Sequence, residues 1–434
     1  MALDGGASGA RFAAYMAGLG RVIGRAGRAA QLNEYCAGLL MPLKRKSVEP
    51  IAAMTAPAQC SAKHQSLLHF VGNSPWSDEA VLAKVRAQVL PAIERHGPIR
   101  AWIIDDTGLP KKGDHSVGVK RQYCGQLGKT ANCQVAVSLS VASDTASLPV
   151  AYRLFLPKDW AEDDERRAKA GVPDDITFKT KGEIALDQIK AAQAAGIAPG
   201  VVLADAGYGP STPFRTGLTD LGLTYIVGVL CNISVWPPGT APLPPTGKGR
   251  RANIRLRRDE NHQPISANEL ALSLDDAHWH DITWREGSNA PLASRFAAVR
   301  VRPANGDHKR SVAREIEWLL IEWPEGEVEP TKYWLSTLPD DIGLQELVDL
   351  AKLRWRIERD YQDLKQEIGL GHYEGRRWRG FHHHATLAIA AYGFLILEAD
   401  AISPSATDNR WRANPLRSKT PQLPKSFRPR GAAA

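Results

Sequence analysis

The stretch "IRAWIIDDTGLP" (residues 99–110) is a short run of apolar and β-branched residues that is interrupted by glycine and ends in proline. Such a run predicts a buried strand. It carries two adjacent carboxylates, Asp105 and Asp106, which are costly on an apolar strand unless something neutralises at least one of them. Neighbouring side chains on a strand point to opposite faces, so the two do not easily share one site. Either one of them faces a metal ion, or both lie at an exposed strand end or cap a turn.

The residues that follow predict a mixed α/β domain. Two further strand candidates are joined by a short polar turn and predict a hairpin, after which helices and strands alternate. Gly196 ends the first helix of this series. The predicted elements are "CQVAVSLSVAS" (133–143), "LPVAYRLFLP" (148–157), the helix "KGEIALDQIKAAQAAG" (181–196), the strand "GVVLADAGYG" (200–209), a helix from about Thr212 to Leu221, and the strand "TYIVGVL" (224–230).

Outside this core the pattern changes three times. The N-terminal part reads as helices, with Ser77 as an N-cap. Past Cys231 come proline-rich and short alternating runs, which predict a strand-rich insertion. The domain then resumes with a long helix from about Leu344 to Ile368 and a last apolar helix, before a polar, basic tail. The expected domains are a helical domain (1–97), the first core part (98–230), the insertion (231–335), the second core part (336–402) and a disordered tail (403–434).

Composition excludes several classes of protein. The 434 residues are enough for two or three domains. Five cysteines without a CxxC pair predict neither a disulfide framework nor a zinc site, and they fit a reducing cytosol. No apolar segment resembles a signal peptide, and the longest apolar run (385–397) is too short to span a bilayer. We therefore expect a cytoplasmic protein without a membrane partner.

The net charge of +8 is unevenly distributed along the chain. Residues 1–50 hold seven Lys and Arg against three acidic residues, and residues 401–434 hold seven against one. A third basic cluster, "GKGRRANIRLRR", lies at 247–258. Such clusters attract a polyanion such as DNA, with a strong dependence on salt. Basic residues that serve only solubility are the alternative.

Two more carboxylates occupy positions suited to a site. Asp205 ends the strand at 200–209, where ligands gather in open α/β sheets, although it could also cap a turn. In "RWRIERDYQDLK" (354–365), a step of about 100° per residue places an apolar stripe on one helix face. Glu358 lies beside that stripe, between Arg354 and Lys365. A surface ion pair between Arg354 and Glu358 is the alternative.

Three carboxylates without a cysteine or histidine set favour a hard cation, Mg²⁺ or Mn²⁺. Two such ions about 4 Å apart can activate an attacking oxygen and stabilise a leaving oxygen of a phosphodiester. Arg and Lys nearby would hold the phosphate backbone. The competing metal site is "HHH" at 382–384 with His372, but consecutive histidines on a helix point about 100° apart.

These residues resemble a known family, the bacterial insertion-sequence transposases of the DDE type with a Tyr-Arg-Glu-Lys signature. Arg354, Glu358 and Lys365 have the spacing of that signature, and Asp106 followed by Thr and Asp205 at a later strand end resemble its two aspartates. The stretches at 110–134 and 35–47 are also similar to one subgroup. The sequence departs from the signature at Ala351, where the family has a tyrosine that is associated with phosphate binding.

The resemblance implies a ribonuclease H-like core, a mixed sheet flanked by helices, whose insertion helps to grip the transposon end. Asp106, Asp205 and Glu358 would ligate two Mg²⁺ (or Mn²⁺) ions. The candidates for DNA phosphate contacts are Lys120, Arg121, Lys129, Arg354 and Lys365, with a solvated basic loop as the alternative. Partners would be double-stranded DNA, namely inverted repeats and target DNA, and a second copy of the chain in a synaptic homodimer.

Two other functions remain open from the sequence. A phosphatase-like hydrolase also uses strand-end aspartates, but it commonly needs a second Asp two residues after the first, where this chain has Gly108 after Thr107. A non-catalytic DNA-binding protein descended from a transposase is the other alternative, and the presence of all three carboxylates argues against it.

Overall fold

The computed structural model describes residues 5–246, 254–286 and 291–402. The predicted tail (403–434) and the first part of the basic cluster at 247–258 lie outside the described residues. The chain divides into two compact units, and each is described by itself. The first unit comprises Met1–Ile99, Asp105–Ala198 and Arg356–Ala434, and the second comprises Arg100–Ile104 and Pro199–Trp355.

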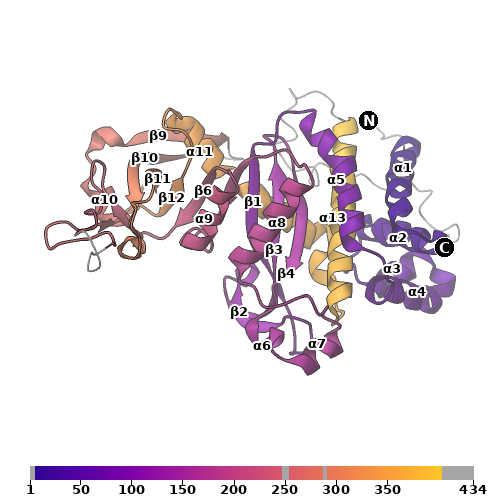
Figure 1. Ribbon diagram of the computed structural model, residues 1–434. Coiled ribbons are helices and arrows are strands. Elements are labelled where there is room, and N and C mark those ends of the chain that lie inside the picture. Colours follow the sequence, from indigo (N-terminus) through magenta and orange to yellow (C-terminus); the bar gives the residue numbers. More distant parts are fainter. Residues whose placement is uncertain (1–4, 247–253, 287–290, 403–434) are drawn as a thin grey trace. The chain divides into compact units, whose positions relative to one another are not determined.

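The N-terminal part of the first unit is helical, as predicted. Its helices are α1 (Gly5–Ile23), α2 (Ala26–Leu40), α3 (Val48–Thr55), α4 (Cys60–Gly72) and α5 (Asp78–Glu94). The predicted N-cap is confirmed, because the hydroxyl of Ser77 accepts from the backbone N–H of Ala80 at 3.1 Å. These helices pack around the last helix of the chain, α13 (Trp378–Ile402), which lies along α5 (Figure 1). They therefore share a core with the C-terminal part of the unit.

Helix α13 has 25 residues and extends beyond the apolar run that predicted it. By length and composition it could cross a membrane, but 72% of its most apolar window is buried inside the protein. The hydroxyl of Tyr15 in α1 donates to the carbonyl of Ala390 at 2.9 Å, and Ser8 and Arg11 both bond the buried carboxylate of Glu398. Helix α13 is thus a core helix of the first unit.

The sheet of the first unit contains the predicted hairpin. Strand β3 (Lys129–Ala142) pairs antiparallel with β4 (Ser147–Leu154) and, at its other end, with β2 (Lys120–Cys124). Strand β1 (Ala101–Pro110) lies next to β3 and contributes Asp105–Pro110 to this unit. Two short helices, α6 (Lys158–Ala161) and α7 (Asp164–Ala170), follow β4, and then α8 (Lys181–Ala194) packs on β3 and β4 (Figure 1).

The two faces of this sheet bury different residues. On one face, Leu109 of β1, Ala136 of β3 and Leu154 of β4 form a core cluster with two residues of α13, Trp378 and Phe381. On the other face, a smaller cluster contains Cys124, Cys133 and Val135, with Phe155 packed against it. The alternation of side chains along a strand separates the two clusters.

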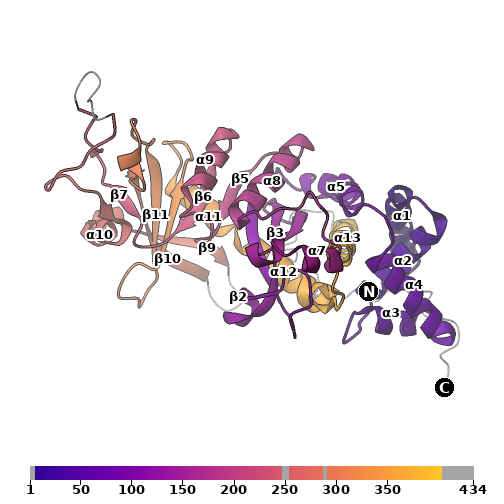
Figure 2. The same ribbon diagram turned by 60° about the horizontal axis from the view of Figure 1, so that its bottom comes forward.

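The second unit is built on a mixed sheet. Its elements are β1 over Ala101–Ile104, β5 (Val201–Ala204), α9 (Thr212–Asp220), β6 (Tyr225–Val229), β7 (Ser234–Trp236), β8 (Ile265–Ser266), α10 (Ala267–Ser273), β9 (His280–Glu286), β10 (Pro291–Pro303), β11 (Glu317–Trp323), β12 (Lys332–Ser336) and α11 (Leu344–Lys352). Strands β1, β5 and β6 are parallel, and β12, β11, β10, β7 and β8 continue the sheet antiparallel. Figure 2 shows β9, β10 and β11 side by side.

The predicted insertion at 231–335 is strand-rich, and it extends the sheet of β5 and β6 through β12. The prediction of one long helix from Leu344 to Ile368 is wrong. Helix α11 ends at Lys352, a turn contains Leu353 and Arg354, and α12 (Trp355–Asp363) begins anew before a π-helical turn (Leu364–Ile368). The apolar residues before the break and after it are all buried, so their spacing in the sequence does not reveal the break.

The fold class is confirmed: a mixed α/β sheet flanked by helices, consistent with a ribonuclease H-like core.

Candidate active site

The start of α8 reaches strand β1 through one ion pair. The ammonium nitrogen of Lys181 lies 2.6 Å from Oδ2 of Asp106, and both side chains are partly exposed. The chain before Lys181 is anchored by a capping box in which Thr180 and Glu183 bond each other's backbone N–H. This Lys was not recognised from the sequence, because it lies 75 residues from Asp106 and only the fold brings them together.

Asp105 makes different contacts. One of its carboxylate oxygens accepts from the backbone N–H of Asp106 at 2.8 Å, and its carbonyl accepts from the hydroxyl of Ser138 at 3.2 Å. The pKa of Tyr361 in α12 is raised well above its usual range, mainly by burial, and the negative charge of Asp105 adds to this rise. The charge of Asp105 therefore acts on a buried residue of α12.

Glu358 lies on α12 and is exposed, whereas Ile357, Asp360 and Tyr361 of the same helix are buried. The carboxylate of Asp360 accepts from the hydroxyls of Ser147 and Tyr392, both at 2.8 Å. These contacts hold α12 to β4 and α13, while Glu358 faces outward. The burial of the Asp360 carboxylate was not predicted from the sequence.

Lys365 lies in the π-helical turn after α12. Burial lowers its pKa, and the nearby Cys124, Asp105 and Asp106 oppose that shift. A cation from the predicted signature thus lies near both aspartates of β1. π-Helical turns occur frequently at functional sites.

Asp205 belongs to the second unit and directly follows β5. Its Oδ1 accepts from the backbone N–H of Gly207 at 2.8 Å, so the carboxylate does cap its own turn. Gly209 ends this turn against β6, where a Cβ would lie 1.8 Å from the carbonyl oxygen of Gly228. Only glycine fits there, which fixes the path of the chain after Asp205.

The predicted DNA contacts are distributed over both units. Lys120, Arg121 and Lys129 are exposed on the β2–β3 hairpin of the first unit, and Lys120 pairs with Asp159 at 2.9 Å. Arg354 is in the turn between α11 and α12, within the second unit, so the helical arrangement predicted for it does not hold. Ala351, at the signature's tyrosine position, is buried in α11.

A further basic cluster was missed because its residues come from three segments that are far apart in the sequence. Burial lowers the pKa of Lys46 to about 8, and burial together with the charge of Arg45 lowers that of Lys111 to about 8. The pKa of His372 is lowered by burial and by the charges of Arg45 and Lys46. The ammonium groups of Lys46 and Lys111 donate to backbone carbonyls, so they stabilise the loops in which they lie.

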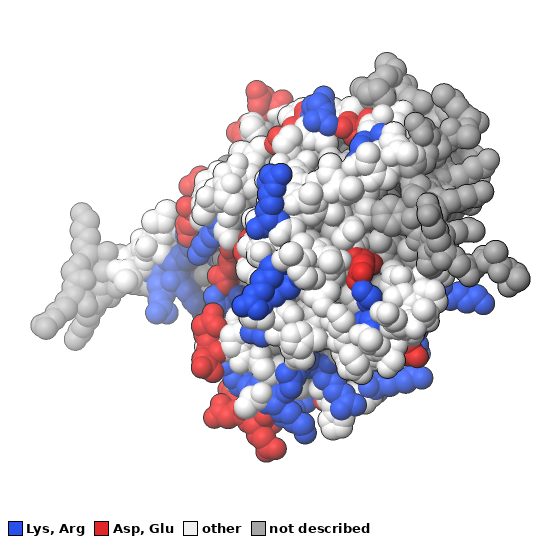
Figure 3. All heavy atoms as spheres, turned by 90° about the vertical axis from the view of Figure 1, so that its right-hand side faces the viewer, with Lys and Arg blue, Asp and Glu red and all other residues white. Residues whose placement is uncertain are grey.

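On the surface over α1 to α4, basic side chains are interspersed with acidic ones (Figure 3).

The three consecutive histidines are structural. His382 accepts from the backbone N–H of Leu154, and its other nitrogen faces the carbonyl of Trp378. His384 lies between the hydroxyl of Tyr35 and the carbonyl of Gly369. His383 lies between two backbone carbonyls, and the neutral ring donates to one of them at a time. Burial lowers the pKa of all three, to about 4 for the last two.

Within the described ranges, no group of three or more His, Cys, Asp or Glu side chains is placed to hold a metal ion. The chemistry of the predicted donors nevertheless suits Mg²⁺, which prefers carboxylate oxygens.

Comparisons with known proteins agree with this chemistry. A family model described as DDE superfamily endonuclease matches residues 18–291, a range that includes Asp106 and Asp205 but ends before Glu358. The chain is also similar to a probable transposase for insertion sequence element IS701 from Microchaete diplosiphon, with 36% identity over 335 residues. The match covers 76% of this chain and 73% of that protein.

Proposed function

The chain belongs to the DDE superfamily of endonucleases and is an insertion-sequence transposase, and from this premise we propose that it binds the inverted-repeat ends of its own element, cleaves them and joins the freed 3′-hydroxyls to target DNA. The observation that carries the proposal is the match to the DDE endonuclease family model and to an insertion-sequence transposase, and the charges of the β1 aspartates also act on Lys365 from the signature stretch. These groups are distant in sequence, and carboxylates beside a lysine suit phosphodiester chemistry.

Three carboxylates would hold two Mg²⁺ (or Mn²⁺) ions: Asp205, Glu358 and an aspartate of β1, which the sequence motif assigns to Asp106. When bound, such ions supply an activated attacking oxygen and stabilise the leaving oxygen. Lys365 and Arg354 would bind the phosphate next to the carboxylates, and Lys120, Arg121 and Lys129 would bind the backbone further along the DNA.

We further propose the assembly in which this occurs. The helices within residues 1–97 would contact the transposon end, and the strand-rich insertion would help to grip it. Two copies of the chain would bring two ends together in a synaptic dimer. The protein would act in the cytoplasm at the nucleoid. A DNA-binding protein that has lost catalysis is the alternative.

The test uses purified protein and a DNA duplex that carries the element's end. Glu358→Gln is expected to abolish Mg²⁺-dependent cleavage while end binding in a gel-shift assay is largely retained, because an amide keeps the shape of the side chain but removes the charge that holds the metal. The assignment of Asp106 from the sequence motif expects the same result for Asp106→Asn. Glu367→Gln is the matched control, since Glu367 is exposed in the same stretch, and it should cleave normally.

Cleavage by Glu358→Gln would contradict the proposed site. Cleavage by Asp106→Asn alone would contradict only the assignment of Asp106. The DNA that flanks the coding sequence separates the alternatives further: short inverted repeats bounded by a target duplication support transposition, and their absence supports the binder.

A further inference from the structure

The adjacent aspartates of β1 face different sides of the sheet. Leu109 of β1 packs with Trp378 and Phe381 of α13. Asp105 lies four residues before Leu109, so alternation along the strand places it on that same face. Asp106 and Gly108 then face the opposite side, and a Cβ on Gly108 would lie 2.9 Å from the sulfur of Cys124, in the opposite cluster.

Contacts of other elements agree with this division. On the α13 face, the rings of Tyr152 in β4 and Tyr361 in α12 stack with centroids 6.3 Å apart, and the charge of Asp105 acts on Tyr361. Helix α12 also carries Glu358. Asp105 and the helix of Glu358 are therefore on the same side of the sheet in the first unit.

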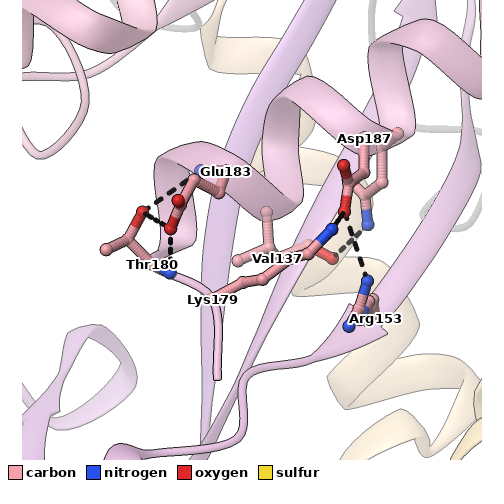
Figure 4. Close-up of polar contacts among 7 residues, drawn as sticks. Val137, Arg153, Lys179, Thr180, Glu183 and Asp187 are labelled. Atoms are coloured by element: carbon pink, nitrogen blue, oxygen red, sulfur yellow. Dashed lines mark hydrogen bonds and ion pairs between the residues drawn. The ribbon is translucent and has the colours of Figure 1, made fainter. Parts of the chain in front are cut away.

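On the other face, Asp106 pairs with Lys181, whose ammonium also lies 6.0 Å from the ring centroid of Phe155. Figure 4 shows how firmly the start of α8 is held: Thr180 and Glu183 bond each other, and Lys179 and Arg153 both reach Asp187. Lys181 follows directly after this anchored segment. Its partner carboxylate is thus already neutralised by a lysine of the protein.

We propose that the two aspartates have divided roles: Asp105 supplies the first carboxylate of the catalytic site, and Asp106 forms a structural ion pair with Lys181 that ties α8 to β1. This inference rests on the proposed function and refines its site. With this division of roles, metal binding does not have to break the ion pair of Asp106, whereas a metal ion at Asp106 would have to displace Lys181.

The experiment measures Mn²⁺ binding to the DNA-free full-length protein by electron paramagnetic resonance, together with end cleavage and Tm. Asp105→Asn is expected to weaken Mn²⁺ binding about tenfold or more and cleavage about 100-fold or more, with Tm nearly unchanged. Asp106→Asn and Lys181→Met should each lower Tm by about 1–3 °C and leave Mn²⁺ affinity within about threefold. The Tm of the double variant Asp106→Asn/Lys181→Met should be no lower than that of the less stable single variant.

Loss of Mn²⁺ binding in Asp106→Asn would overturn the inference, whether or not Asp105→Asn also loses it. Lys181→Met tests whether Asp106 binds the metal and leaves the Asp106 side chain unchanged. Markedly tighter Mn²⁺ binding by this variant would show that Lys181 competes with the metal at Asp106, and it would contradict the inference. Glu358→Gln serves as the reference. If it binds Mn²⁺ and cleaves like the unmodified protein, the proposed site of three carboxylates fails, independently of which aspartate is used. If the unmodified protein does not cleave the element end, the proposed function itself fails.

Discussion

Asp360 is a buried carboxylate two residues from Glu358, and its environment makes its ionisation costly. Burial raises its pKa to about 6, although the hydroxyls of Ser147 and Tyr392 oppose the shift. Its second oxygen has no hydrogen-bond partner among the residues that the structure describes. Because the pKa in the folded state exceeds the value of about 4 in an unfolded chain, the stabilising effect of protonation is present below about pH 4 and is lost as the pH rises through about 6.

We predict that Asp360→Asn reduces the pH dependence of stability between pH 4 and 8. The carboxylate contributes about 1–3 kcal/mol to that dependence, and the amide does not titrate. Tyr392→Phe is the matched variant: it removes a donor that favours the ionised form, so the loss of stability should move to higher pH. Thermal unfolding across this pH range is the measurement, and an unchanged dependence in Asp360→Asn would rule out the role of Asp360.

At the scale of the element, α8 shows how a short sequence signal controls the position of a side chain. Thr180 is the N-cap and Glu183 the third helical residue, and together they form a capping box (Figure 4). Gln188, five residues after Glu183, donates to the carbonyl of Val137 in β3 at 3.0 Å. The helix start is thereby fixed to the sheet, and Lys181 is held where it meets Asp106.

We predict that Thr180→Ala lowers the free energy of unfolding by about 0.5–2 kcal/mol, because the backbone N–H of Glu183 loses its acceptor. Thr180→Ser keeps the hydroxyl and should retain most of the stability. Urea unfolding of both variants at one pH gives the comparison. Equal stability of the alanine and serine variants would mean that the cap contributes nothing.

At the scale of the whole molecule, the proposed DNA binding would draw on the net charge of +8. The exposed residues Arg121 and Lys129 lie on one hairpin. Each phosphate that such a residue neutralises releases counterions, and this makes binding weaker as salt increases.

We predict that Arg121→Ala/Lys129→Ala reduces the magnitude of the slope of log affinity against log salt by about 2, nearly equally for element ends and unrelated DNA. Lys190→Ala, which removes an exposed charge from α8, is the control and should leave the slope unchanged. Fluorescence anisotropy at several salt concentrations measures both. A slope that is the same in the double variant and the control would exclude the hairpin from the DNA interface.

Local patterns were sufficient for the type of most elements. The apolar run at 99–110, the alternation in the hairpin and the Ala-rich helix at 181–196 all appear as predicted, because each depends on neighbours within a few residues. The prediction of one long helix from Leu344 to Ile368 was wrong for the opposite reason. Its break at Leu353 and Arg354 leaves the apolar residues on both sides buried, so periodicity alone could not detect it.

The sequence by itself predicted the family and the fold class, and it supplied the candidate residues of the proposed site: carboxylates at strand ends, Glu358 in a signature stretch, and an oxygen-donor set that suits Mg²⁺. Only the tertiary structure decided which side chains meet. It paired Lys181 with Asp106, buried Asp360, surrounded the three histidines with backbone partners, and placed Asp105 on the side of α12. The reason is physical: a residue's type is a local property, whereas its partners and its burial depend on segments far along the chain that pack against it.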